Sequence, residues 1–279
     1  MELYHKTSGK ISKIVTRSYS TSFSLGISLF SPTYRDAIYG IYGFVRLADE
    51  IVDTFHDYDK AKLMSDFRKD TDKALKTGLS TNPILHSFAQ TVKKYEINYA
   101  YIKAFLDSME KDLTNSYYED KEYNEYIYGS AEVVGLMCLQ VFCGKNSKLF
   151  NELIDPAKAL GSAFQKVNFL RDIKSDIDER GRIYLPGVDK EIEINDTNKQ
   201  KLESEIETEF SAALKGIKKL PHGVKLGVYS AYLYYKVLFK KIKKMRVKEL
   251  MKRRVRISNF TKTALLIKSL VEVKILKNT

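Results

Sequence analysis

The chain has 279 residues, of which 47 are Lys or Arg and 35 are Asp or Glu, so its formal net charge is +12. A hydrophobic share of 44% and a charged share of 29% are typical of a folded globular protein and exclude wholesale disorder. No stretch approaches the roughly 18 consecutive apolar residues of a membrane span, and the N-terminal MELYHKTSGK has no apolar signal segment. We therefore expect a protein without a membrane span that folds as one domain over residues 1–279.

The two cysteines, Cys138 and Cys143, lie close together in apolar sequence. Because no set of His and Cys at zinc-ligand spacing accompanies them, we expect buried, reduced thiols and not a metal site. Reduced thiols favour a cytoplasmic protein.

The positive charge is concentrated at the C-terminal end. Residues 236–279 carry 15 basic and 2 acidic residues, whereas residues 1–235 are nearly neutral. Such a basic segment indicates an anionic partner, which could be a nucleic acid, a phospholipid surface or a phosphorylated substrate.

Helical periodicity dominates the sequence. In chain order, the clearest predicted helices are Ala37–Phe55, Pro156–Asp178, Asn198–Lys219 and Val224–Lys248. Pro32 and Pro156 are expected in first helical turns, with Ser31 and Asp155 as caps. The segment Arg180–Asn195, with two glycines and a proline, is the least helical. The fold class is therefore all-α, with roughly eight to ten helices in one bundle.

The predicted helix Ala37–Phe55 carries a pair of acids near its end. Asp49 and Asp53 are four residues apart and project from one face, with Arg46 one turn earlier. Taken alone, such a pair is also common on solvated surfaces. The neighbouring Asp57 and Asp59 make the whole region acidic, which weakens the signal.

A second polar stripe lies on the helix predicted at Pro156–Asp178. At about 100° per residue, Gln165, Asn168, Asp172 and Asp176 share an arc of roughly 80°. Two amides and two short acids are poor core material, and a solvated face more typically carries Lys and Glu. This pattern favours a coordinating site.

The two acid pairs together predict a metal-dependent phosphate site. Four carboxylates converging on one cavity repel each other unless cations neutralise them. Oxygen ligands of this kind select Mg²⁺, which bridges carboxylates to substrate phosphates. Arg46 and Arg171 would add phosphate donors. With 19 Tyr and 14 Phe, the chain can also supply an aromatic cavity wall, and aromatic faces stabilise carbocations.

These motifs resemble those of the squalene and phytoene synthase family, and the resemblance runs through most of the chain. The segment 160–186 reproduces the family's second signature, including Leu160, Gly161, Gln165, Asn168, Arg171, Asp172, Asp176, Arg182, Tyr184 and Pro186. Segment 46–53 matches the first aspartate-rich motif, with Glu50 where a second Asp is common. Ser20 to Phe23 resembles an N-terminal SxSF element, but Thr21 replaces a basic residue.

Two further segments carry the resemblance. Tyr126–Gly135 resembles the family's small-residue signature, from which Ile127 and Glu132 depart. Helical geometry places Glu132 away from the small-residue groove. Tyr234 and Tyr235, followed by Arg253–Val255, resemble the family's last helices.

The resemblance implies an all-α isoprenoid synthase fold and a role for each matching residue. Mg²⁺, or Mn²⁺ in its place, and the diphosphates would be held by Asp49, Asp53, Asp172 and Asp176. Diphosphate binding or positioning of the metal cluster is implied for Ser20, Ser22, Arg46, Gln165, Asn168, Arg171 and Arg254. The cavity near the ionising carbons would be lined by Phe23, Tyr42, Tyr126 and Tyr235.

The implied reaction joins two prenyl diphosphates head to head through a cyclopropyl diphosphate. Two C20 geranylgeranyl diphosphates would give phytoene, the product that we favour, for which NADPH is not expected. The alternative joins two C15 farnesyl diphosphates into dehydrosqualene or squalene. A head-to-tail prenyl synthase is less consistent, because its DDxxD motifs do not match DEIVD and DIKSD.

A non-enzymatic alternative is a basic helical protein that binds membranes or RNA with a dead site, although a dead homologue should have lost some of the four aspartates. The basic segment interleaves apolar residues, which suits a surface helix at an anionic membrane. We therefore expect peripheral membrane contact and no nucleic acid.

Overall fold

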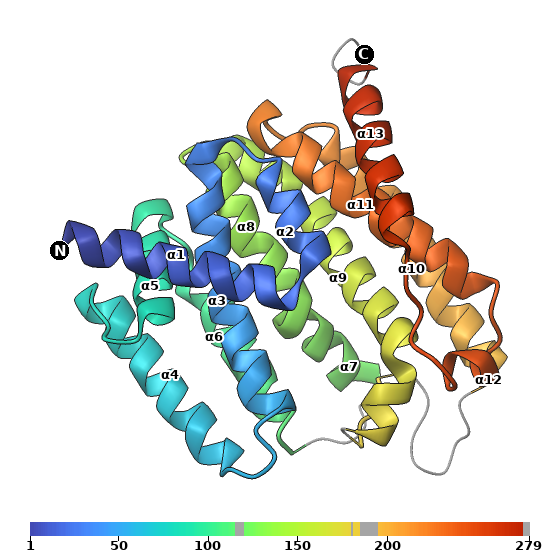
Figure 1. Ribbon diagram of the computed structural model, residues 1–279, viewed down its shortest axis with the longest axis horizontal. Coiled ribbons are helices and arrows are strands. Elements are labelled where there is room, and N and C mark those ends of the chain that lie inside the picture. The colour runs from blue at the N-terminus through green and yellow to red at the C-terminus, as the bar shows by residue number, and fades with distance from the viewer. Residues whose placement is uncertain (115–119, 180, 185–194, 276–279) are drawn as a thin grey trace.

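The computed structural model describes residues 1–114, 120–179, 181–184 and 195–275, which form helices and no strand. Figure 1 shows them as a bundle around the long helix α9. In chain order the elements are α1 (Glu2–Tyr19), α2 (Thr21–Ser28), α3 (Pro32–Asp53), α4 (Lys60–Thr77), α5 (Pro83–Tyr95), α6 (Tyr99–Lys111), α7 (Asp120–Ile127), the π-helix η1 (Tyr128–Glu132), α8 (Val133–Cys143), α9 (Ser147–Asp178), α10 (Asp196–Ile217), α11 (His222–Lys243), α12 (Val247–Leu250) and α13 (Asn259–Ile275).

The all-α prediction is confirmed, although the described residues contain more helices than expected. Thirteen α-helices are present in the described part of the chain, because short segments such as α2 and α12 form separate helices. The segment predicted at Val224–Lys248 ends at Lys243, and α12 follows it. Residues 181–184 are not helical, as predicted for Arg180–Asn195, and most of that segment lies outside the described residues.

The prediction that Pro156 begins a helix is wrong. Pro156 lies inside α9, which begins at Ser147 with the side chain of Asn146 as its N-cap. A proline costs the helix one backbone hydrogen bond, but its ring here packs against Gly216 of α10. A Cβ at Gly216 would lie 2.2 Å from the Pro156 Cβ, so the glycine makes room for the ring. Pro32, by contrast, stands in the first turn of α3 as predicted.

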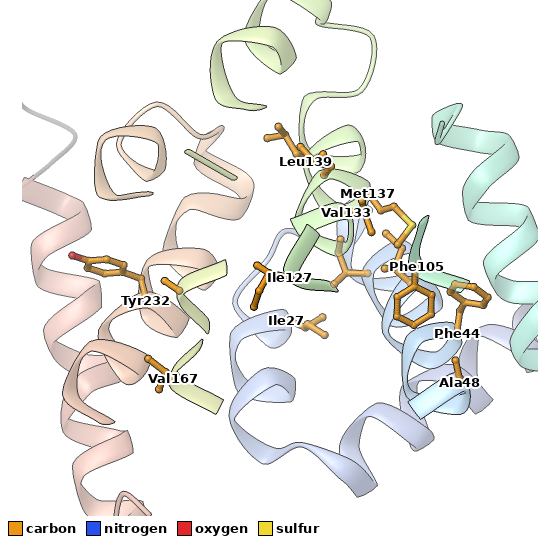
Figure 2. Packing of buried hydrophobic residues seen from close by; sticks show 14 of the residues in the cluster. Ile27, Phe44, Ala48, Phe105, Ile127, Val133, Met137, Leu139, Val167 and Tyr232 are labelled. Carbon is orange, nitrogen blue, oxygen red and sulfur yellow. The ribbon is translucent and has the colours of Figure 1, made fainter. Parts of the chain in front are cut away.

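Helices α3 and α9, which carry the two acid pairs, belong to one packed core. α3 packs against α1, α5 and α8, while α9 packs against α8, η1 and α10. Phe44 of α3 and Phe105 of α6 have ring centroids 5.4 Å apart, and Figure 2 shows both among the buried residues that include Val133 and Met137. The burial of these apolar faces holds α3 and α9 in fixed positions.

The helical run Lys121–Cys143 is long and apolar enough, by length and composition, to cross a membrane. Half of its most apolar window is nevertheless buried inside the protein. Val133, Met137 and Val141 are each at most 1% exposed. The run therefore behaves as a core helix.

Candidate active site

A cavity of about 460 Å³ lies between α2, α3, α8, α9 and α11. It contains nearly all of the residues that the sequence singled out. Its lining includes Phe23, Tyr42, Arg46, Asp49, Asp53, Tyr126, Gln165, Asn168, Arg171, Asp172, Asp176, Tyr235 and Arg254. Ser20 and Ser22 instead line a second pocket of about 380 Å³, which shares Phe23, Arg171, Tyr235 and Arg254 with the cavity. Tertiary packing thus brings both acid pairs into one chamber.

The acid pair of α3 is accompanied by arginines. Asp53 Oδ1 accepts a hydrogen bond of 2.9 Å from Arg182. Arg46 pairs with Glu50. This hydrogen bond, together with the charge of Asp49, raises the pKa of the Arg46 guanidinium. Burial opposes that rise but does not overcome it. Each acid of the first pair therefore lies close to a guanidinium group, Arg46 near Asp49 and Arg182 beside Asp53.

The acid pair of α9 is similarly placed. Asp172 contacts the guanidinium of Arg171, and its Oδ1 lies 2.7 Å from the Nε of Arg254. Burial acts to raise the pKa of Asp172, but the hydrogen bond and charge of Arg171, together with Arg254, hold it below its usual value. Asp176 is 8% exposed and lines the same cavity.

A buried acid that the sequence analysis missed lies beside these residues. Asp112, 6% exposed, accepts hydrogen bonds from the hydroxyls of Tyr126 at 2.7 Å and Tyr184 at 3.2 Å. The Tyr184 hydroxyl also accepts from Arg182 at 3.2 Å, so this cluster is connected to Asp53. One signal could have found it. Asp112 continues the buried stripe of α6 three residues after Met109, and an acid in register with an apolar stripe is a candidate for burial.

The predicted aromatic residues stand along the cavity wall in pairs. The ring centroids of Phe23 and Tyr42 are 5.1 Å apart, and Tyr235 stacks on Phe164 at 3.9 Å. The Tyr235 hydroxyl donates to Asn168 Oδ1 at 3.1 Å, which orients the amide. Burial raises the pKa of Tyr42 to about 12, so its hydroxyl stays protonated at neutral pH.

The small-residue segment after Tyr126 forms another wall. Ser130, Ala131, Val134, Gly135 and Cys138 line the cavity, whereas Glu132 turns away and pairs with a lysine of α9. The placement of Glu132 is thus confirmed. Part of this segment is the π-helix η1, a local irregularity that is often found at functional sites. Burial raises the pKa of Cys138 to about 12, in agreement with an inert thiol.

The second pocket provides a cation where the sequence lacked one. Thr21 replaces the expected basic residue, but Lys262 of α13 places its Nζ 3.3 Å from the Thr21 hydroxyl. Lys262, Arg254 and Arg256 all line this pocket with Ser20 and Ser22. The tertiary fold therefore restores a basic residue at this position from the other end of the chain.

The oxygen atoms that line the cavity suit a hard cation, although arginine side chains already pair with Asp53 and Asp172. Among the described residues, no three His, Cys, Asp or Glu side chains are arranged to hold a metal ion as they stand. The four aspartates and the amide oxygens of Gln165 and Asn168 nevertheless line one cavity, and such oxygens are the ligands that Mg²⁺ prefers. Arg46 Nε and Ser130 Oγ are buried without a hydrogen-bond partner among the described residues. Both belong to cavity-lining residues, where a polar ligand could satisfy them.

Solved structures identify the fold. A dehydrosqualene synthase in complex with ligand superposes with a TM-score of 0.81 at 20% identity, covering 97% of this chain and 98% of that chain. Squalene synthase HpnC from Alicyclobacillus acidocaldarius gives a TM-score of 0.75 at 17% identity, covering 87% of this chain and 95% of that chain. The fold is therefore the all-α isoprenoid synthase fold.

The particular family follows from the sequence match. The chain belongs to the squalene/phytoene synthase family, whose sequence model matches residues 16–261. A chloroplastic phytoene synthase of Daucus carota is 31% identical over 240 residues, covering 80% of this chain and 60% of the relative. The 4,4'-diapophytoene synthase of Staphylococcus haemolyticus is 28% identical over 173 residues, covering 61% of this chain and 59% of the relative. The matched region thus spans about three fifths of the length of these curated relatives.

Proposed function

We propose that the protein joins two prenyl diphosphates head to head in a Mg²⁺-dependent reaction. The observation that carries the proposal is the cavity itself, which is lined by two acid pairs, three arginines and an apolar wall, with a fourth arginine, Arg182, bonded to Asp53. That wall includes Ile38, Leu139, Phe142, Leu153, Leu160 and Ile217. A diphosphate with a long hydrocarbon chain has the same division between a highly charged end and an apolar remainder.

The diphosphate end would be held by Mg²⁺ on Asp49, Asp53, Asp172 and Asp176. The bound cation would neutralise the charge that develops on the leaving diphosphate. Arg171 and Arg254 already contact Asp172 and could transfer hydrogen bonds to phosphate oxygens, because guanidinium groups bind both carboxylates and phosphates. Mn²⁺ has similar ligand preferences and is a possible substitute.

The first half-reaction breaks the C1–O bond of one substrate, whose diphosphate leaves with the electron pair. The C2=C3 double bond of the second substrate then attacks the allylic cation, and loss of a proton closes a cyclopropyl diphosphate. The released diphosphate is a suitable base, so no histidine is needed. The faces of Phe23, Tyr42 and Tyr235 provide the negative potential that stabilises such cations.

In the second half-reaction the cyclopropyl diphosphate ionises, rearranges and loses a proton. We favour geranylgeranyl diphosphate as the substrate and phytoene as the product, supported by the Daucus carota relative. The second candidate, dehydrosqualene from farnesyl diphosphate, is favoured by the Staphylococcus haemolyticus relative. Both products arise by deprotonation, so NADPH is not expected in either case, whereas squalene would require a hydride donor.

Product analysis tests the proposal. The purified chain is incubated with C15 or C20 diphosphate and Mg²⁺, with and without NADPH, and the hydrocarbons are extracted. We expect phytoene from the C20 substrate and no product after chelation of the metal. A C30 hydrocarbon as the main product would overturn the choice of substrate.

The acid pairs are tested in the same assay. Asp49→Asn and Asp172→Asn should each lower diphosphate release by at least about 100-fold, as expected when a group that stabilises the transition state is lost. Asp178→Asn is the matched control, because Asp178 also lies on α9 but is exposed and pairs with Lys174 at the surface. Near-normal turnover in the first two variants would contradict the assignment of the aspartates.

A further inference from the structure

The outer face of α13 is apolar and exposed, although the helix packs firmly onto the protein. Phe260, Ile267 and Val271 are 85%, 58% and 55% exposed. At about 100° per residue these three side chains fall within an arc of roughly 40°. Leu270, also exposed, lies at the edge of this stripe. Single exposed apolar residues are normal on protein surfaces, but an aligned stripe indicates an interaction surface.

The opposite face of α13 is bound to α11, so the exposure is a stable feature of the fold. Ser269 and Val273 are 0% and 7% exposed. The hydroxyls of Ser269 and Ser230 lie 2.6 Å apart, and Tyr229 donates to Glu272 at 2.8 Å. In Figure 1 α13 runs along the edge of the bundle beside α11. The inner face of α13 is therefore held against α11, whereas its outer face has no partner among the described residues.

Basic residues surround this stripe. Exposed side chains of Lys252, Arg253 and Arg256 directly precede α13, and Lys268 and Lys274 flank its outer face. From residue 250 to the end of the sequence, Glu272 is the only acidic residue, and it is engaged by Tyr229. An apolar stripe with a basic border is complementary to the acyl chains and anionic headgroups of a bilayer surface.

We propose that the outer face of α13 docks the protein on an anionic lipid bilayer, with the helix lying in the interface. A polyanion such as RNA would use the basic residues but would leave the apolar stripe in water. A second copy of this chain would present equally basic residues against them, and like charges oppose such an interface. The bilayer is the occupant that satisfies both the stripe and its border.

Docking through α13 would place the second pocket beside the bilayer. The second pocket opens between α2 and α13, where Leu25, Leu265 and Leu266 line it, and shares Phe23 and Tyr235 with the central cavity. An amphiphile that leaves a bilayer beside α13 would meet this pocket before the cavity. Only this use of the pocket as an entrance rests on the proposed function; the docking itself does not.

Because the sequence contains no tryptophan, a single introduced tryptophan can be excited selectively and reports on its own position. Ile267→Trp places one indole on the stripe, and Tyr58→Trp places one at a distant site that is 69% exposed. With vesicles containing about one third phosphatidylglycerol in phosphatidylcholine, Ile267→Trp should shift to the blue and be quenched by brominated acyl chains. Tyr58→Trp should do neither. Equal responses of the two probes, or no response of either, would overturn the proposal.

Binding of the full chain to the same vesicles by sedimentation supplies the second measurement. The triple variant Phe260→Ser, Ile267→Ser, Val271→Ser should bind at least about tenfold more weakly, while Leu3→Ser, which removes an exposed apolar residue from α1, should bind normally. Replacement of Lys268 and Lys274 by Gln should weaken binding about fivefold per charge at low salt. Unchanged vesicle binding in these variants would contradict the docking proposal. Light scattering that shows a dimer whose interface covers the stripe would also contradict it. Turnover of detergent-dispersed substrate should be unaffected in the triple variant, so failure of docking and failure of the proposed enzyme activity are distinguishable.

Discussion

Replacement of Asp112 by Asn should destabilise the protein more than any comparable change of a surface acid. The buried carboxylate accepts hydrogen bonds from Tyr126 at 2.7 Å and Tyr184 at 3.2 Å, and it lies 3.9 Å from the guanidinium of Arg182. The isosteric amide has only one acceptor oxygen and no charge. A hydrogen bond to a charged group contributes about 1.5–3 kcal/mol, and the lost attraction to Arg182 adds to it, so we expect a cost of about 2–4 kcal/mol.

Thermal and urea unfolding measure this cost. A loss of about 2–4 kcal/mol should lower the Tm by roughly 5–12 °C in a protein of this size. Asp107→Asn is the matched control, because Asp107 lies on α6 a few residues before Asp112, is 41% exposed and pairs with Arg68 at the surface, where an ion pair contributes about 1 kcal/mol or less. Tyr126→Phe removes only one of the two donors and should have an intermediate effect. If Asp112→Asn were as stable as Asp107→Asn, the buried cluster would not contribute as we argue.

Three further predictions concern other parts of the molecule. Burial and the neighbouring His5 lower the pKa of His86, so the folded state binds fewer protons than the unfolded state. The free energy of unfolding should therefore fall as the pH drops below about 6.5, and parallel urea titrations of His86→Phe should show a smaller fall over the same range. Lys262→Met should raise the KM for the prenyl diphosphate severalfold with kcat nearly unchanged, whereas an equal effect on kcat would argue against simple phosphate binding. Gly161→Ala should destabilise by about 1–3 kcal/mol, because its Cβ would meet a backbone oxygen of η1 at 2.7 Å, while Gly9→Ala, with open space around it, should not; similar Tm values for the two would refute the packing argument.

The local parts of the site could be predicted from the sequence because they depend on helical periodicity. Spacings of three and four residues place Asp49 with Asp53, and Asp172 with Asp176, on single faces of their helices. The same periodicity separated Glu132 from the small residues that line the cavity. The all-α class followed from the same regularity and from the scarcity of helix breakers.

Relations between distant segments were decided only by tertiary packing. Arg182 bonds to Asp53 across 129 positions, and Lys262 reaches Thr21 across 241, distances over which no helical rule applies. Pro156 remains within a helix because Gly216, on a different helix, leaves space for its ring. Helical periodicity relates residues that are only a few positions apart. Which two helices meet depends instead on how the apolar faces of all the helices are buried together, and this arrangement exists only in the folded molecule.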